Sequence, residues 1–224
     1  MKYAALIAVV GLGLSSCDAR GRRAAEVRAI RPNEVANFGE LFSQNCSGCH
    51  GKDGQGALTV GIGRPVYLAI ANDAMIRRTI EEGRAGTPMP AFAQHAGGML
   101  TDAQIEILVR GIRNWATLSA SDYENLPPYT SSQTGDAARG REVFVSACSS
   151  CHGQDGRGAR AIADRSYLAL VTDQHLRTLM IVGMPNLGMP DWRGHPKPLT
   201  GADVTDLVAW LASQRESLLT HLNH

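Results

Sequence analysis

The chain has 224 residues, enough for one large domain or two small ones. Hydrophobic residues make up 44% and charged residues 19%, which excludes a disordered chain, and a net charge of +1 gives no support for nucleic-acid binding. Aromatic residues are only 5%, few for a protein that must build two cores, and five cysteines, an odd number, argue against a pure disulfide framework.

The first predicted element is a leader. Lys2 precedes an apolar run over residues 4–14, which as a helix would span roughly 16 Å, about half the hydrocarbon thickness of a membrane. The run therefore predicts a signal peptide over residues 1–16 rather than a membrane span. The Leu-Ser-Ser sequence before Cys17 resembles the bacterial lipoprotein signal, in which that cysteine is lipidated. An ordinary secretory signal with a chance cysteine is the alternative.

Residues 17–34 are predicted to form a basic, lipid-anchored tether. Five arginines with few acids between them lie here: Arg20, Arg22, Arg23, Arg28 and Arg31. Each such charge near an anionic membrane surface contributes on the order of 1 kcal/mol of attraction, and a solvated tether is the alternative. Asp18 resembles the inner-membrane retention signal of some Gram-negative lipoproteins, which implies the periplasmic side of the inner membrane. No later run of 18 apolar residues predicts a membrane span.

The rest of the chain repeats itself at an offset near 100 residues. Cys-Ser-Gly-Cys-His at residues 46–50 matches Cys-Ser-Ser-Cys-His at residues 148–152, each with a phenylalanine four residues before it. An Asp-Gly-x-Gly turn, Tyr-Leu-Ala, a glycine followed by Met-Pro, and Leu-Thr occur in the same order in both copies. The matches predict a duplicated domain of about 80 residues. The predicted limits are residues 35–118 for the first domain, 119–135 for a Ser- and Pro-rich linker, and 136–224 for the second domain.

Each copy predicts the same series of helices. A first helix precedes the cysteines, and a short middle helix lies around Asp73–Glu82 in one copy and around Asp173–Val182 in the other. Thr101 and Thr200 are plausible N-caps of the last helices. Apolar residues in these helices recur at i, i+3, i+4 and i+7: Ile105, Leu108, Val109 and Ile112, and Val204, Leu207, Val208 and Leu211. No convincing period-two strand occurs, so the predicted fold class is all-α.

Cys-x-x-Cys-His is the attachment motif for haem c. Two thiols about one helical turn apart reach the two vinyl groups on one porphyrin edge, and the adjacent histidine turns toward the iron. A zinc site would need two such pairs clustered as four ligands, and a redox pair would need no following histidine. The motifs predict two covalent haem c groups, on Cys46 and Cys49 with His50 at the iron, and on Cys148 and Cys151 with His152 at the iron.

With these motifs the sequence from about residue 35 onward resembles dihaem cytochromes c built from two Met/His-ligated domains. The resemblance implies Met89 as the second ligand of the first iron and Met189 as that of the second. Met184 lies five residues before Met189 and is an alternative ligand of the second iron. Bis-histidine ligation is a further alternative, with His95, His175 and His195 as its candidates.

The family also packs a glycine of its first helix against an aromatic residue of its last. Gly140 and Trp210 fit this pattern in the second copy, whereas Phe38 and Gly111 reverse it in the first. We therefore predict a large residue filling the space of a small one in both domains. The family commonly uses a proline carbonyl to accept a hydrogen bond from the proximal histidine, and Pro65 fits that place in the first copy. Candidates for contact with haem propionates are Arg64, Arg165 and Trp192.

The resemblance implies single-electron transfer between respiratory or photosynthetic redox partners at a membrane, such as an oxidase, a reductase or a quinol-oxidising complex. The protein would be a free carrier or a subunit of such a complex, and not an enzyme by itself. A haem enzyme of the peroxidase or thiosulfate-oxidising type, with one labile or open axial site, is the alternative. Because small domains with few aromatic residues have marginal cores, the chain without haem is predicted to be largely unfolded.

Overall fold

A computed structural model of the protein describes residues 29–56 and 59–216. The described residues from Pro32 onward belong to one compact unit. The predicted signal peptide and Cys17, with most of the predicted tether, lie outside the described residues. Within the described ranges, no helix combines the length and the apolar character that a membrane crossing requires.

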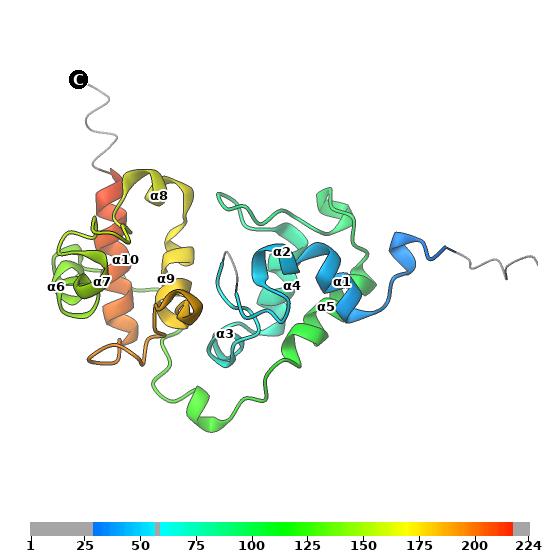
Figure 1. The fold of residues 1–224 in the computed structure, drawn as a ribbon, viewed down its shortest axis with the longest axis horizontal. Coiled ribbons are helices and arrows are strands. Elements are labelled where there is room, and N and C mark those ends of the chain that lie inside the picture. The colour runs from blue at the N-terminus through cyan, green and yellow to red at the C-terminus, as the bar shows by residue number, and fades with distance from the viewer. Residues whose placement is uncertain (1–28, 57–58, 217–224) are drawn as a thin grey trace, which may run out of the picture. The chain divides into compact units, whose positions relative to one another are not determined.

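The regular structure of residues 29–56 and 59–216 is helical, apart from two isolated bridges, which confirms the all-α prediction (Figure 1). The helices of the first domain are α1 (Phe38–Asn45), α2 (Ser47–His50), α3 (Pro65–Ile70), α4 (Asp73–Glu82) and α5 (Asp102–Arg113). Those of the second domain are α6 (Ala137–Ala147), α7 (Ser149–His152), α8 (Arg165–Leu170), α9 (Asp173–Val182) and α10 (Gly201–Glu216). Short 3-10 turns lie at Pro32–Glu34, Gln94–Ala96, Ala120–Asp122 and Pro185–Leu187. The same order of five helices occurs twice, as the sequence repeat predicts.

The ends of the helices follow from their capping residues. The predicted bounds of α4 and α9 are confirmed, and each helix is capped by the residue before it: the Asn72 and Thr172 side chains accept from backbone amides three residues on. Thr101 forms a reciprocal capping box with Gln104 at the start of α5. The buried Gln104 amide also donates to the carbonyl of Pro32 at 2.8 Å, which ties the start of this unit to α5.

The first and last helices of each domain pack closely through a glycine. In the second domain, a Cβ atom at Gly140 would lie 2.0 Å from the Asp206 carbonyl oxygen and 3.0 Å from the Cβ of Trp210. In the first domain, a Cβ atom at Gly111 would lie 2.0 Å from the Phe38 ring. The predicted exchange of large and small residues between the two helices is confirmed, and neither glycine site has room for a side chain.

We expect Gly111→Trp to overpack the first domain, because the Phe38 ring already occupies the space that the new side chain needs. Overpacking of this kind costs about 1–3 kcal/mol. Thermal unfolding of the holoprotein measures the effect, with Arg110→Trp as the control, since the Arg110 side chain on the same helix is 66% exposed. Equal melting temperatures for the two variants would contradict the packing described here.

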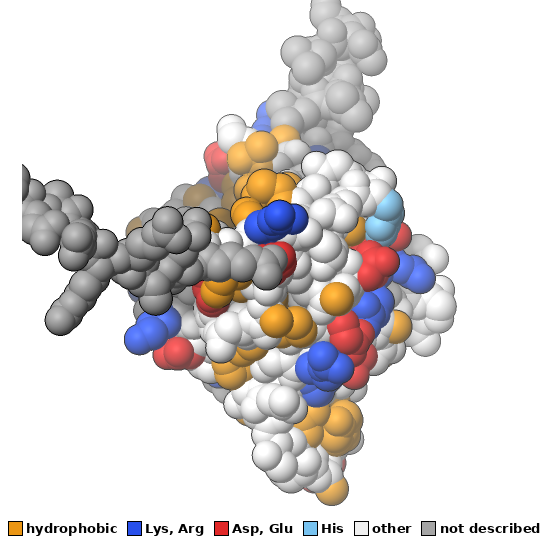
Figure 2. All heavy atoms as spheres, turned by 90° about the vertical axis from the view of Figure 1, so that its right-hand side faces the viewer, with side chains coloured by type: hydrophobic (Ala, Val, Ile, Leu, Met, Phe, Trp, Pro, Cys, Tyr) orange, Lys and Arg blue, Asp and Glu red, His pale blue; other side chains and the backbone are white. Residues whose placement is uncertain are grey.

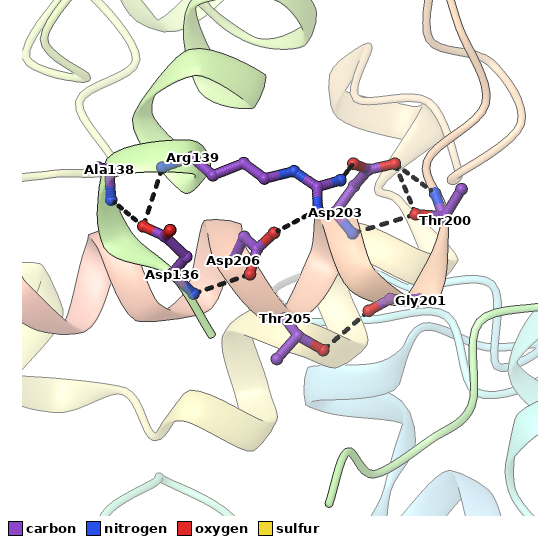
Figure 3. A network of polar contacts seen from close by, with 8 residues as sticks. All are labelled: Asp136, Ala138, Arg139, Thr200, Gly201, Asp203, Thr205 and Asp206. Atoms are coloured by element: carbon purple, nitrogen blue, oxygen red, sulfur yellow. Dashed lines mark hydrogen bonds and ion pairs between the residues drawn. The ribbon is translucent and has the colours of Figure 1, made fainter. Parts of the chain in front are cut away.

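A polar network fastens the start of α6 to α10 in the second domain (Figure 3). The Asp136 amide donates to Asp206 Oδ1 at 2.8 Å, and the Arg139 guanidinium lies 3.0 Å from Asp203 and 3.4 Å from Asp206. Burial alone would raise the pKa of Asp203, but hydrogen bonds from Thr200 and the charge of Arg139 outweigh it and hold that pKa below its ordinary value. The Asp203 carboxylate therefore stays ionised at neutral pH, and its pair with Arg139 joins the two helices.

An arginine near the end of the last helix braces the turn before the middle helix in both domains. Arg113 donates to the carbonyls of Leu68 and Ala71 and to Asp73 Oδ1, at 2.6, 2.6 and 2.7 Å. Arg215 donates to the carbonyls of Leu168 and Val171 and to Asp173 Oδ1, at 2.8, 3.0 and 2.8 Å. The two arginines occupy different positions in the repeat. Arg113 directly follows Ile112, whereas Arg215 lies four residues after Leu211, the residue that aligns with Ile112.

The surface around α4 and α5 carries charges of both signs. Arg77 pairs with Glu106, and the Arg110 guanidinium lies 3.9 Å from the same carboxylate. On the face drawn in Figure 2, basic and acidic side chains lie side by side among scattered apolar ones. Exposed pairs of this kind contribute at most about 1 kcal/mol each, so they shape the surface more than they stabilise the fold.

Candidate haem-binding sites

Each Cys-x-x-Cys-His motif forms a single helical turn, α2 or α7, directly after the first helix of its domain. Cys46 and Cys148 end the preceding helices and are half-buried, whereas Cys49 and Cys151 are exposed, and all four are free thiols. Burial, together with the neighbouring cysteine, raises the pKa of Cys46 to about 12 and that of Cys148 to about 11. The thiols of Cys46 and Cys148 are therefore neutral at pH 7, and in each motif the second thiol lies about one turn further along, the spacing that thioether attachment to a porphyrin edge requires.

The proximal histidine of the second domain is oriented by a backbone carbonyl. His152 Nδ1 lies 2.6 Å from the Arg160 carbonyl oxygen, so Nδ1 carries the proton and Nε2 is left free to bind a metal. Arg160 lies eight residues after the histidine, in the loop that leads to α8. The second domain thus holds its histidine without a proline.

The histidine of the first domain faces the matching carbonyl, that of Val60. Burial lowers the pKa of His50, and the Val60 carbonyl opposes that shift. His50 Nδ1 is buried and forms no hydrogen bond of standard geometry with any described residue. The expectation that Pro65 supplies this carbonyl is wrong, because Pro65 is instead the first residue of α3, a position that its fixed φ favours.

The two predicted methionine ligands lie in loops folded back against the end of the middle helix. Gly83 and Gly183 end α4 and α9 with φ of 69° in both cases. A Cβ atom there would meet the backbone of Pro90 at 2.5 Å or of Pro190 at 2.4 Å, so only glycine permits this approach. The residue after each glycine then donates its amide to the carbonyl of Met89 or Met189, at 3.0 and 2.9 Å, and both methionines are half-buried. Met89 and Met189 therefore occupy equivalent places.

Met184 lies directly opposite Met189 in an isolated antiparallel bridge. The two residues exchange both amide-to-carbonyl hydrogen bonds, at 2.9 and 3.1 Å. Side chains of such a pair lie on the same face of the bridge, so both thioethers point to one side of the loop. In the first domain Arg84 takes the place of Met184. The bridge by itself therefore leaves both methionines as candidates for the second iron.

Several buried donors in the described residues have no partner within the protein. Trp192 is 5% exposed, and its indole N–H makes no hydrogen bond; the same holds for Nε of Arg64. An unmet buried donor costs about 1–3 kcal/mol, and both residues were predicted to contact haem propionates, whose carboxylates accept such bonds. The third candidate, Arg165, has a partner within the protein. The thiols, the free Nε2 of His152 and these unmet donors fit a covalent haem.

The other histidines have different surroundings. His95 is exposed in a 3-10 turn. Burial, and then the charge of Arg84, lowers the pKa of His175. His195 Nδ1 lies 3.3 Å from the Ala147 carbonyl, just before the second motif, and its Nε2 is buried without a partner. Bis-histidine ligation remains an alternative that rests on these three residues.

Trp115 is a half-buried residue packed against the core of the first domain, and it was not predicted from the sequence. Its ring packs edge-on against Phe42, with centroids 4.7 Å apart, and covers Gly54 in the turn after the motif. In the second domain the Trp210 ring packs against Phe144, with centroids 4.3 Å apart, beside the corresponding Gly156. Trp115 thus fills from beyond the end of α5 the space that Trp210 fills from within α10. A glycine at position 111 with a tryptophan four residues later was the available signal.

Comparison with known proteins agrees with this duplicated arrangement. The family profile described as "Cytochrome C oxidase, cbb3-type, subunit III" matches residues 33–110 and again residues 135–211. A "Cbb3-type cytochrome c oxidase subunit CcoP" from Azospirillum sp. (strain B510) is 28% identical over 196 residues, which cover 83% of this chain and 54% of the relative. A "Cbb3-type cytochrome c oxidase subunit FixPc" from Rhizobium leguminosarum bv. viciae is 29% identical over 200 residues, 80% of this chain and 62% of the relative.

A third relative, "Cbb3-type cytochrome c oxidase subunit FixP" from Azorhizobium caulinodans, is 29% identical over 134 residues, 56% of this chain and 40% of the relative. The chain therefore spans between 40% and 62% of the length of these three curated relatives. Each of the two matched regions contains one Cys-x-x-Cys-His motif and the loop that carries Met89 or Met189, and the loop of the second region also contains Met184.

Proposed function

The chain belongs to the family of cbb3-type cytochrome c oxidase subunit III, and we propose that it passes single electrons to a membrane-bound redox complex. It is a dihaem c-type cytochrome, with one haem on each Cys-x-x-Cys-His motif. The observation that carries the proposal is the duplicated site. In each domain a motif turn follows the first helix, and a half-buried methionine lies in a loop fixed against the end of the middle helix.

Bound haem supplies an iron centre that takes up and releases one electron at a time. We propose that the chain holds the two groups through Cys46, Cys49, His50 and Met89, and through Cys148, Cys151, His152 and Met189. The Arg160 carbonyl keeps the proton of His152 on Nδ1, so Nε2 stays available to the iron. We propose that the indole N–H of Trp192, which is buried without a partner in the protein, donates to a propionate.

Ligation by histidine and methionine favours electron transfer over substrate chemistry. A thioether is a soft ligand that favours Fe(II) and raises the reduction potential. Two protein ligands on each iron leave no open position for a substrate, which argues against a peroxidase or thiosulfate-oxidising reaction. The relatives compared above are named as subunits of cbb3-type cytochrome c oxidases, so we propose a terminal oxidase of that type as the electron acceptor.

We further propose that a lipid on Cys17 holds the protein at the periplasmic face of the inner membrane. The support is the apolar run, the small residues before the cysteine and the five arginines after it. Such an anchor confines the carrier to the plane of its partners and raises their effective concentration. The anchor lies outside the described residues.

The function is tested on the full chain expressed in a host that matures c-type cytochromes. We expect two haems per chain, Met-to-ferric-iron charge-transfer absorption from both, and oxygen uptake by membranes containing a cbb3-type oxidase once the reduced protein is added. The same cells test the anchor, since Cys17→Ser is expected to move the protein from the membrane to the soluble fraction. Rapid stoichiometric binding of carbon monoxide to the native protein would favour the haem-enzyme alternative and overturn the proposal.

A further inference from the structure

The segment between the two domains is fastened to the second domain by a buried arginine. Arg177 of α9 is 4% exposed, and its Nε and Nη2 atoms donate to the Pro128 carbonyl at 2.9 and 2.8 Å. Nε also lies 3.1 Å from the Tyr129 carbonyl, which accepts a second bond of 2.8 Å from Gln174. Nη1 of the same arginine donates to Thr205 Oγ1 in α10 at 3.0 Å. The backbone at Pro128 and Tyr129 is therefore fixed on the second domain.

The side chain of Tyr129 reaches the first domain. Its hydroxyl accepts a hydrogen bond of 2.7 Å from Arg84 Nη1, in a partly buried position. Arg84 begins the loop that carries Met89: its amide donates to the Met89 carbonyl at 3.0 Å, and its own carbonyl accepts from both the amide and the hydroxyl of Thr87. A bond that fixes the Arg84 side chain therefore fixes one end of the Met89 loop.

The Met89 loop has fewer backbone bonds than its counterpart. In the second domain Met184 and Met189 exchange two backbone hydrogen bonds. In the first domain only one such bond joins Arg84 to Met89, because the Met89 amide donates to Thr87 Oγ1 at 3.3 Å instead. The Met89 loop, which has fewer backbone hydrogen bonds, is thus the loop whose arginine, Arg84, is hydrogen-bonded to Tyr129 of the linker.

The charge of Arg84 acts on both sides of this contact. Burial raises the pKa of Tyr67 to about 12, and Arg84 is among the cations that oppose that rise. Burial, and then Arg84, lowers the pKa of His175 in α9. The guanidinium thus lies near the ring of a core residue of its own domain and near a helix of the other. A hydrogen bond with a charged donor in such a place is about twice as strong as a neutral one.

We propose that Tyr129 is a positioning residue for the Met89 ligand, acting through Arg84, so that ligation of the first iron depends on the linker docked on the second domain. This inference rests on the proposed function, because it takes Met89 as the axial ligand of the first haem. It assigns the linker a part in the first haem site, beyond joining the two domains.

The test is Tyr129→Phe in the full-length holoprotein, which removes only the hydroxyl. Added imidazole binds ferric iron only when the methionine leaves, so its binding rate reports how often the loop opens. We expect the rate at the first haem to rise about tenfold, as the loss of one charge-assisted hydrogen bond predicts. The reduction potential of the first haem should fall, and that of the second should not change. The first haem is identified by the methionine methyl NMR signal that Met89→Ala removes.

Two further variants make the test specific. Tyr123→Phe is the matched control, since Tyr123 lies in the same linker and is 53% exposed. Arg84→Leu removes the guanidinium that donates to Tyr129 without adding a thioether beside Met89, and it should give the same change as Tyr129→Phe with nothing added in the double variant. A Tyr129→Phe protein that behaves like Tyr123→Phe, or effects that add in the double variant, would overturn the inference. If the wild-type first haem lacks methionine ligation, the ligand assignment in the proposed function fails first.

Discussion

Alanine at both Cys148 and Cys151 is expected to yield a chain with one covalent haem, a folded first domain and a largely unfolded second domain. The second domain has few large aromatic residues in its core, chiefly Phe144, Trp192 and Trp210. A core of this size in a small domain supplies only about 3–5 kcal/mol by itself, so the covalent macrocycle provides apolar volume that the chain lacks. Haem quantitation per chain and hydrogen exchange resolved by domain measure the result.

The matched control is alanine at Cys46 and Cys49, which should unfold the first domain and spare the second. Removing all four thiols should leave a chain without haem and largely unfolded. A haem-free chain that is compact and melts cooperatively would show that the protein core alone is sufficient. It would also remove the explanation for the low aromatic content of 5%.

Replacing Met189 by alanine is expected to abolish the charge-transfer absorption of the second haem and to open that iron to carbon monoxide. About half of the total absorption should be lost, because each domain contributes one such site, and the potential of the second haem should fall since thioether ligation raises it. Met89→Ala should do the same at the first haem. Optical titration in both redox states, with carbon monoxide binding to the reduced protein, measures these changes.

Met184→Ala is the decisive companion to this experiment. Met184 shares a face of the bridge with Met189, yet its counterpart in the first domain is Arg84, which is not a ligand. We therefore expect Met184→Ala to keep full absorption and to exclude carbon monoxide. Loss of the band in Met184→Ala, with retention in Met189→Ala, would reverse the assignment of the second iron.

Much of the fold was predictable because local sequence and tertiary structure agree. The bounds of α4 and α9 follow from capping residues before each helix and a glycine after it. The pairing of Phe38 with Gly111 was predictable because two copies of one fold must fill the same space, and a loss of volume on one helix requires a gain on the other.

The parts that were not predictable depend on backbone groups and on contacts between distant segments. The carbonyl that orients His152 belongs to Arg160, and no side-chain pattern indicates which peptide in a loop will face a ring. The prediction for Pro65 followed the family's common use of a proline carbonyl, and it is wrong because the Val60 carbonyl faces His50 instead. The linker was predicted only from its content of serine, threonine and proline, and composition does not indicate that Arg177 would bind the carbonyls of Pro128 and Tyr129.

The two arginine braces have a consequence for how the duplicated domains diverged. Counted from the capping threonines, Arg215 lies three residues further along its helix than Arg113 does, so a residue-by-residue alignment places Arg113 against Ala212. Three residues amount to about 4.5 Å along a helix, nearly a full turn. The two arginines therefore make the same hydrogen bonds in both domains, although they occupy different positions in the aligned sequences of the last helices. A common ancestral sequence inferred by aligning the two domains residue by residue would therefore lack this arginine at one of the two positions. A chimera that exchanges the last helices of the two domains would need a three-residue adjustment in helix length to restore these hydrogen bonds.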